Sequence, residues 1–141
     1  MLYSIIFCSD QDDVWVPQKA EKMLLVYEKH PEAMLVFSDG ELVDGDLNLL
    51  GCNIWKAIGI TPEKITEGDW FHYLMKTCLI TGAAMSFKRE LLNDVDEIPE
   101  EWLHDGWLAF AAATRKGLVP CNERLFLYSP HSNFIITMLP I

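Results

Sequence analysis

The sequence has little cysteine and no C-x-x-C pair. The four cysteines lie far apart along the chain, at Cys8, Cys52, Cys78 and Cys121. This spacing argues against a zinc ribbon and against a dense disulfide framework, and it is typical of a protein from a reducing, cytoplasmic setting. Basic residues are also scarce, because 11 Lys and Arg face 21 Asp and Glu, for a formal net charge of −10. Such acidity repels nucleic-acid backbones, so we expect no nucleic-acid partner.

Long apolar runs, low-complexity tracts and internal repeats are missing as well. Residues 1–9 are apolar, but they carry no basic flank and are too short for a signal peptide or a membrane span. The apolar run 134–141 is also too short to cross a bilayer, so we expect no transmembrane segment. We expect this run to pack on the domain. The alternatives are that it joins a partner or that it touches a membrane surface, which for a cytoplasmic protein is the inner face. The 141 residues, half of them hydrophobic, suffice for one domain with its own core.

The chain opens with the pattern of a strand, a helix and a second strand. Residues 2–8 and 33–37 are apolar runs typical of buried strands, and Pro17 opens a helix that we expect to end near residue 30. This order predicts a parallel pair of strands with a right-handed crossover. The expected apolar face of the helix consists of Ala20, Met23, Leu24 and Tyr27.

The remaining elements follow from turn signals and periodicity. Asp44-Gly45-Asp46 predicts a hairpin between residues 41–43 and 47–50, whereas residues 51–66 are expected to be irregular. Further expected elements are a helix at 67–78, a strand at 83–87, a short helix at 89–93, a helix at 103–116 with Leu108, Ala111 and Ala112 inward and Gly117 as its stop, and strands at 118–119 and 124–128. The fold class is therefore α/β, with a mixed sheet flanked by helices in a single domain, 1–141.

Three carboxylates follow the first strand directly, at Asp10, Asp12 and Asp13. In open α/β sheets, ligands bind beyond the carboxyl ends of the strands. Alternate carboxylates there can converge with phosphate oxygens on a hard cation such as Mg²⁺ or Mn²⁺. The same residues can also be a plain acidic loop in which Asp13 caps the following helix. The spacing alone leaves both interpretations open.

The wider stretch IIFCSDQDDVWVPQK, residues 5–19, resembles the strand–DxD–helix segment of the family 2 glycosyltransferases, close to their rhamnosyltransferase-like branch. The matching positions are Ser9, Asp10, Gln11, Asp12, Asp13, Trp15, Pro17 and Lys19. Later segments resemble the same family in the same order, at Phe37-Ser38-Asp39, Leu42-Val43-Asp44, Leu49-Leu50-Gly51, residues 81–87, Ile98-Pro99, His104-Asp105-Gly106-Trp107, and Leu127-Tyr128 with His131 and Asn133. The resemblance covers nearly the whole chain and implies a partial GT-A-like fold, that of the nucleotide-diphospho-sugar transferases.

The resemblance implies a donor side built on the acidic segment. Asp10 would face the ribose of a UDP- or dTDP-linked sugar, and Asp13 would support the same cofactor-binding loop. Asp12 would bind the Mn²⁺ or Mg²⁺ that bridges the diphosphate, with His131 as a further metal ligand. Such an ion neutralises the charge that develops on the leaving nucleoside diphosphate.

On the acceptor side, the resemblance implies that Asp105 is the general base, which takes the proton of the attacking hydroxyl. Thr81, Gly82, His104 and Trp107 would line the place of a saccharide acceptor. A single in-line displacement would invert the anomeric carbon. The residues taken singly also allow ordinary roles: Asp105 can stabilise the first turn of its helix, and Trp107 can be a core anchor.

The chain departs from the family pattern in two places. The strands that precede the metal-binding strand in the family are absent, and Ser129 stands where the family usually has Arg. We therefore expect an open donor pocket and an exposed edge at residues 2–8, which favours a homo-oligomer or pairing with a separate N-terminal half. The expected function is the transfer of a sugar from a nucleotide-diphosphate donor to a saccharide acceptor. Inactivity of this chain when alone is the alternative that the missing strands leave open.

Two other functions remain open from the sequence. The first is a non-catalytic remnant or interaction module that binds a partner chain or a saccharide. The second is a phosphatase of the haloacid dehalogenase type, whose apolar strand also ends in D-x-D. That family expects Thr or Val and then a Gly-rich turn after the motif, whereas Asp13-Val14-Trp15 follows here, so this function ranks third.

Overall fold

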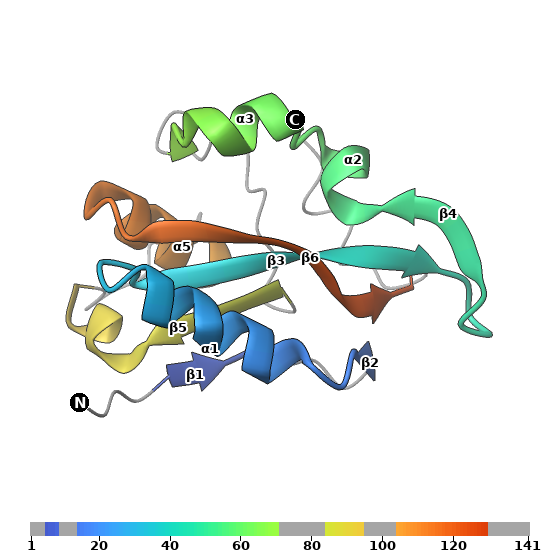
Figure 1. Ribbon diagram of the computed structural model, residues 1–141, viewed down its shortest axis with the longest axis horizontal. Coiled ribbons are helices and arrows are strands. Elements are labelled where there is room, and N and C mark those ends of the chain that lie inside the picture. The colour runs from blue at the N-terminus through green and yellow to red at the C-terminus, as the bar shows by residue number, and fades with distance from the viewer. Residues whose placement is uncertain (1–4, 9–13, 71–83, 95–103, 130–141) are drawn as a thin grey trace.

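The computed structural model describes residues 5–8, 14–70, 84–94 and 104–129, which form a curled mixed sheet with helices against it (Figure 1). The strands are β1 (Ile5–Phe7), β2 (Val14–Trp15), β3 (Leu35–Val43), β4 (Leu49–Asn53), β5 (Met85–Lys88) and β6 (Leu118–Tyr128). The helices are α1 (Lys19–Lys29), α2 (Ile54–Ile58), α3 (Pro62–Glu67) and α5 (His104–Thr114), with a 3₁₀ helix, η2 (Arg89–Asp94). The α/β class is therefore confirmed.

The strand order is β1-β5-β3-β6-β2, with β4 paired to β3. Strand β5 lies antiparallel between β1 and β3, so that Phe87 is opposite Ile6 on one side and Leu35 on the other. Strands β1 and β3 consequently run in the same direction, but the prediction that they form an adjacent pair is wrong. Apolar runs report which segments are buried, whereas the neighbour of each strand is decided by pairing with β5, which comes far later in the chain.

Helix α1 covers one face of the sheet. Met23 and Tyr27 are fully buried against Val36, Cys121 and Leu125. Leu24, which the sequence placed on the apolar face, is exposed by 41%. The buried residues of α1 are Lys19, Met23 and Tyr27, spaced four residues apart. The buried face of the helix therefore includes Lys19 in place of Leu24, and it is turned slightly from the face that the sequence predicted.

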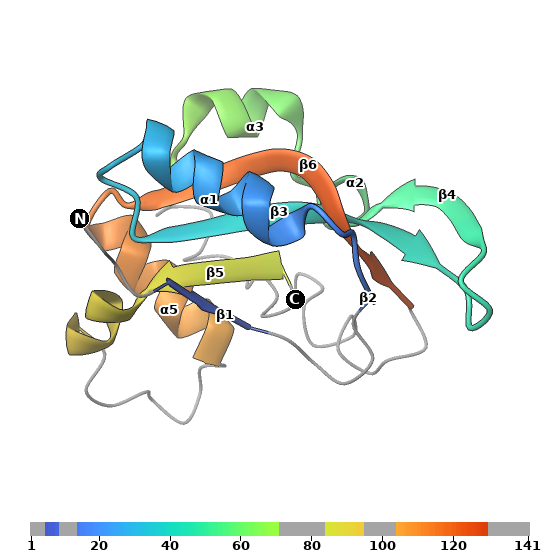
Figure 2. The ribbon, with the colours of Figure 1, turned by 60° about the horizontal axis from the view of Figure 1, so that its bottom comes forward.

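The opposite face of the sheet packs against α5, and Figure 2 shows α1 and α5 on opposite sides of it. Leu108 and Ala112 of α5 are buried as predicted, and Ala109 is buried more completely than Ala111. The core on this side also contains Phe37, with Trp55 and Trp70 tilted or edge-on against its ring. The expected helix at 67–78 lies largely outside the described residues.

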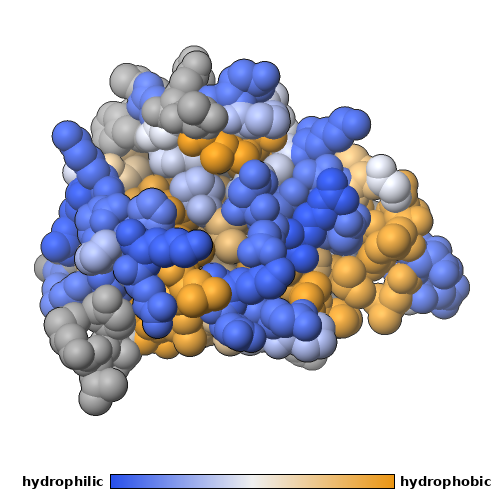
Figure 3. Space-filling view, viewed as in Figure 1, coloured by the Kyte–Doolittle hydropathy of each residue, from blue (hydrophilic) through white to orange (hydrophobic). Residues whose placement is uncertain are grey.

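The predicted hairpin is confirmed by the pairing of β3 with β4, in which Val43 lies opposite Leu49. The Asp44 carboxylate closes the turn by accepting the backbone N–H groups of Asp46 at 2.9 Å and Asn48 at 2.8 Å. Figure 3 shows an apolar surface over this hairpin, which comes from the exposed leucines Leu47, Leu49 and Leu50. Strand β3 is longer than predicted and carries Ser38 and Asp39 in its interior rather than at its end.

Two further expectations are wrong. Residues 51–66 are not irregular, because β4 continues to Asn53 and is followed by α2 and α3. These helices have five and six residues, too few for a hydrophobic period to be visible in the sequence. The two strands predicted at 118–119 and 124–128 are one strand, β6, because residues 122 and 123 bulge out between the pairs Ser38↔Cys121 and Asp39↔Arg124.

Candidate functional site

The segments that carry the predicted site adjoin one end of the sheet. Strands β1, β3 and β6 run in the same direction, and β5 runs against them, so the carboxyl end of β1 and the amino end of β5 lie at the same end. The acidic segment with Asp10, Asp12 and Asp13 follows β1, and Thr81-Gly82 precedes β5. These five residues lie outside the part of the chain that the structure describes. The structure therefore locates only the strands on either side of them, which are β1, β2 and β5.

The two flanks of the acidic segment approach each other. The rings of Phe7 in β1 and Trp15 in β2 have their centroids 5.8 Å apart, although these strands are the two ends of the sheet order. Val14 pairs with Leu127 near the carboxyl end of β6, and Val16 donates its N–H to the Leu125 carbonyl at 3.0 Å. The curled sheet therefore brings the chain before and after the acidic segment to one place. His131 comes after the end of β6 and lies outside the described residues.

A buried lysine follows the acidic segment on its carboxyl side. Lys19 is the first residue of α1 and has no exposed surface, and its Nζ lies 4.2 Å from the ring centroid of Trp15 and 5.2 Å from that of Phe126. A cation at the amino end of a helix opposes the helix dipole, so the two ring faces offset part of an unfavourable placement. The family match at Trp15 and Lys19 gave no sign of this contact, since a motif does not show which side chains are buried.

Helix α5 carries the predicted general base in its first turn. The chain reverses at residues 115–117, where the Gly117 N–H donates to the Ala112 carbonyl at 2.8 Å, and β6 then begins beside β3. The carboxyl end of α5 is thus held at the amino ends of β3 and β6, while its first turn with His104 and Asp105 lies about 16 Å back along the helix axis. This direction leads toward the end of the sheet that the acidic segment adjoins. The side chains of His104 and Asp105 do not belong to the part of the molecule that the structure describes.

Trp107, expected on the acceptor side, is half-buried on α5. Its ring is stacked on that of Phe110, with the centroids 5.7 Å apart and an interplanar angle of 4°. A half-buried indole held by a neighbouring ring agrees with a core anchor, and its exposed part also leaves the predicted acceptor contact open.

A polar network in the described residues is centred on Asp39, a carboxylate that the sequence placed only within a family motif. Asp39 is 4% exposed, and its Oδ1 accepts the N–H groups of Gly40 at 2.7 Å and Trp55 at 3.0 Å. Its Oδ2 accepts Asn53 Nδ2 at 2.6 Å and lies 3.9 Å from Arg124 Nε. Asp39 therefore caps the start of α2 from the neighbouring strand and joins α2, β3 and β6.

A cavity of about 580 Å³ opens beside this network, between α2, α3 and the bulge of β6; we call it the bulge cavity. Its lining residues are Asp39, Asn53, Trp55, Lys56, Gly59, Ile60, Thr61, Pro62, Ile65, Asn122, Glu123 and Arg124. Arg124 bonds to Glu41 at 2.5 Å, which raises the pKa of the guanidinium, and Glu123 bonds to Lys22 at 2.5 Å, which raises the pKa of that amine. No sequence motif marks this cavity, because its walls come from three separate stretches of the chain.

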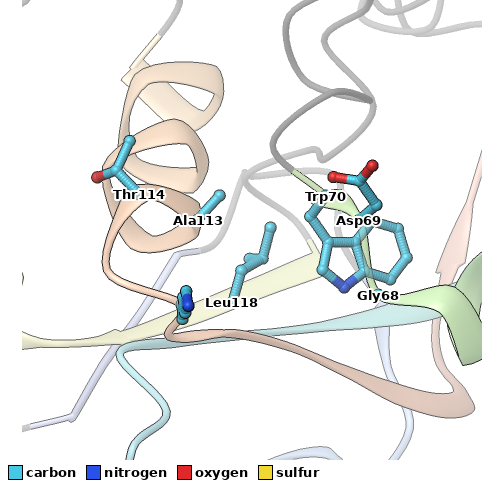
Figure 4. A pocket seen from close by; sticks show the side chains of 7 residues that line it. Gly68, Asp69, Trp70, Ala113, Thr114 and Leu118 are labelled. Atoms are coloured by element: carbon cyan, nitrogen blue, oxygen red, sulfur yellow. The ribbon is translucent and has the colours of Figure 1, made fainter.

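A second cavity of about 490 Å³ lies between α5 and residues 68–70, which follow α3. Figure 4 shows Asp69 and Trp70 across the cavity from Ala113 of α5, with Leu118 between them. Leu118 is the first residue of β6, so this cavity is at the end of the sheet opposite to the one that the acidic segment adjoins. It is therefore separate from the predicted catalytic residues.

Within the described part of the chain, no three side chains of His, Cys, Asp or Glu are grouped so that they could hold a metal ion. In the same residues, no helix has the length and apolar character needed to cross a membrane.

The chain matches no protein-family model, and its sequence matches no curated protein. The class that the described residues define is thus a mixed α/β domain with a curled mixed sheet.

Proposed function

We propose that the chain is a metal-dependent, inverting glycosyltransferase domain with a GT-A-like fold. The single observation that supports this most strongly is topological. The acidic segment, the Thr81-Gly82 segment, the first turn of α5 and the chain beyond β6 all adjoin or lead toward the same end of the sheet. Open α/β sheets bind ligands beyond the carboxyl ends of their strands. A single active site built from these segments requires this arrangement, which is why we take it as the main support for the proposal.

In this proposal, Asp12 and His131 hold a Mn²⁺ or Mg²⁺ ion, for which carboxylate oxygen and imidazole nitrogen are suitable ligands. When bound, the ion would neutralise the diphosphate of the donor. Asp10 contacts the ribose of a UDP- or dTDP-linked sugar, and Asp13 supports the loop.

The proposed general base is Asp105, in the first turn of α5. It accepts the proton of the acceptor hydroxyl as the oxygen attacks the anomeric carbon, and the nucleoside diphosphate leaves from the opposite side, which inverts that carbon. Thr81, Gly82, His104 and Trp107 line the acceptor side. An acceptor in the cytoplasm or at the inner face of a membrane belongs to the same proposal.

Association through β1 is a further part of the proposal. Among the described strands β1 pairs with one neighbour, β5, and we propose that its second edge pairs with a strand from another copy or from a separate chain. Such pairing would extend the sheet on the side where the donor would bind. Sedimentation of the chain at increasing concentration tests self-association, and a constant monomer mass would contradict a homo-oligomer.

The decisive experiment is calorimetry of the purified chain with UDP and with dTDP, each with and without Mn²⁺. We expect binding that requires the ion and that Asp12→Ala abolishes. Asp46→Ala is the matched control, because it removes a carboxylate of the same charge from the exposed turn between β3 and β4, which has no part in the proposed site. Failure of the folded wild-type chain to bind either nucleotide would contradict the donor site and favour a non-catalytic module.

A further inference from the structure

We propose that the bulge cavity binds a neutral saccharide through a site that is separate from the acidic segment. The cavity volume, about 580 Å³, is within the range of small-molecule sites. The polar side chains in its lining come from β3, from the region of α2 and α3, and from β6 at and beside the bulge; they are those of Asp39, Asn53, Lys56, Thr61, Asn122, Glu123 and Arg124. A set of side chains drawn from separate elements to one opening is the arrangement expected of a binding site.

The cavity wall is fixed by buried bonds. Asp39, itself 4% exposed, holds Asn53 through its side-chain amide and the start of α2 through the Trp55 N–H. Residues 122 and 123 leave the β3–β6 ladder at the bulge, so their side chains are available to the cavity rather than to the sheet. A wall held in this way loses little conformational entropy when a ligand binds.

The charges at the cavity disfavour an anion. Its lining contains two acidic residues, Asp39 and Glu123, and two basic ones, Lys56 and Arg124, so its formal charge is zero. Arg124 and Glu123 are also engaged with Glu41 and Lys22, each at 2.5 Å. The chain as a whole carries −10. A phosphate or a polyanion would therefore gain little here, and a neutral polar molecule is favoured.

The chemistry of the lining matches saccharide hydroxyls. The amide of Asn122 has two donor hydrogens and an acceptor oxygen, Lys56 donates and Glu123 accepts, while each hydroxyl both donates and accepts. Pro62 and Ile65, above the buried Trp55 and Ile60, give an apolar surface for the C–H face of a sugar ring. Amides, ions of both signs and an apolar floor together suit a saccharide better than a purely apolar ligand.

The cavity is close to the chain that follows the acidic segment. Leu125, next to Arg124, accepts the N–H of Val16 at 3.0 Å, and β2 begins at Val14. A saccharide in the cavity could therefore be part of the acceptor of the proposed transfer. That last assignment depends on the proposed function, whereas saccharide binding in the cavity does not.

The test is saturation-transfer NMR of the full chain, without metal, against a panel of neutral mono- to tetrasaccharides and their acidic counterparts. The panel contains hexoses, 6-deoxyhexoses and N-acetylhexosamines. We expect at least one neutral saccharide to bind, and we expect Asn122→Ala and Lys56→Met each to weaken its affinity about fivefold to tenfold. Both side chains are exposed, so the variants should fold, which circular dichroism checks.

Two controls make the result specific. Thr114→Ala, at the second cavity, and Asp46→Ala, in the exposed turn between β3 and β4, should leave saccharide affinity unchanged. The proposal is overturned if no neutral saccharide binds, if acidic saccharides bind more tightly, or if both cavity variants keep wild-type affinity. Saccharide binding without metal-dependent nucleotide binding would contradict the proposed glycosyl transfer alone, and the reverse result would contradict the cavity site alone.

Discussion

At the scale of single residues, Asp39 shows how one carboxylate can organise a region of the fold. It is buried in β3 and accepts three hydrogen bonds, from Gly40, Trp55 and Asn53. In Asp39→Ala the Trp55 N–H and the Asn53 amide lose a charged acceptor in a dry environment. We expect the free energy of unfolding to fall by about 3 kcal/mol in urea titrations.

Two variants serve as comparisons for the loss of stability expected in Asp39→Ala. Asp39→Asn keeps one acceptor oxygen, so it should be less harmful than alanine. Asp46→Ala removes an exposed carboxylate from the hairpin turn and should change stability by less than about 0.5 kcal/mol. An Asp39→Ala protein as stable as Asp46→Ala would show that the network contributes nothing.

Cys121 gives the fold a predicted dependence on alkaline pH. Burial, with a smaller contribution from the Glu123 charge, raises the pKa of its thiol from 9.0 to about 11. A raised pKa means that folding favours the neutral thiol. The stabilisation is therefore complete below the unfolded pKa near 9 and is lost as the pH rises toward 11. The loss attributable to this thiol is about 3 kcal/mol at most.

The measurement is the free energy of unfolding from pH 8 to about 11.5 for the wild type and for Cys121→Ala. Burial also raises the pKa of Tyr27, and Glu123 raises that of Lys22, so both proteins should lose stability at the highest pH. The difference between them isolates the thiol, and it should shrink steadily between pH 9 and 11. A difference that is constant with pH would contradict the prediction.

At the scale of elements, the joint between α5 and β6 depends on Gly117. A Cβ atom there would lie 2.7 Å from Met34 Cγ and 3.0 Å from the backbone oxygen of Glu32. The Gly117 carbonyl also accepts the N–H groups of Met34 at 2.7 Å and Leu35 at 3.0 Å, so the backbone cannot move away cheaply. We expect Gly117→Ala to cost about 2 kcal/mol and Gly117→Val to cost more.

Gly51→Ala is the comparison for this joint. Gly51 has a φ of +76° but nothing within 4 Å of a new Cβ, so its substitution costs backbone strain alone, about 1 kcal/mol. Thermal or urea unfolding of the three variants separates crowding from strain. If valine at position 117 costs no more than alanine at position 51, crowding at the joint is not the cause.

Local patterns predicted those elements whose signal lies within their own residues. The helix at α1, the Asp44 turn, the strand at β5 and the helix at α5 all follow from apolar runs and turn residues. Features that depend on distant pairing did not follow. The bulge at residues 122 and 123 looked like the gap between two strands, since its partner is in β3, far away in sequence.

The candidate site divides in the same way. The family resemblance could name Asp10, Asp12, Asp105 and His131, whose roles remain predictions. It could not reveal that Lys19 is buried against Trp15 and Phe126, since that contact joins α1 to β6. Nor could it reveal the bulge cavity, because Asn53, Lys56 and Arg124 meet only after β3, β4 and β6 have paired.

At the scale of the whole molecule, the net charge of −10 complicates any test of metal binding. A divalent cation relieves the repulsion among 21 acidic side chains even if it occupies no site. Binding of the cation to a specific site in the acidic segment raises the free energy of unfolding further, by an amount that depends on the dissociation constant of that site. At a free Mn²⁺ concentration of 100 times that constant, the added stability is about 2.7 kcal/mol.

We therefore expect Mn²⁺ to raise the unfolding midpoint of the wild type above that in NaCl of equal ionic strength, and EDTA to reverse the effect. Asp12→Ala and Asp46→Ala each change the net charge by the same amount, from −10 to −9. Screening must therefore act equally on both variants, whereas a site at Asp12 is lost in only one of them. Retention of the Mn²⁺ effect by Asp46→Ala and its loss in Asp12→Ala would support specific binding. An equal effect in both variants would mean that Mn²⁺ only screens the charge of the chain, and the metal site proposed at Asp12 would be wrong.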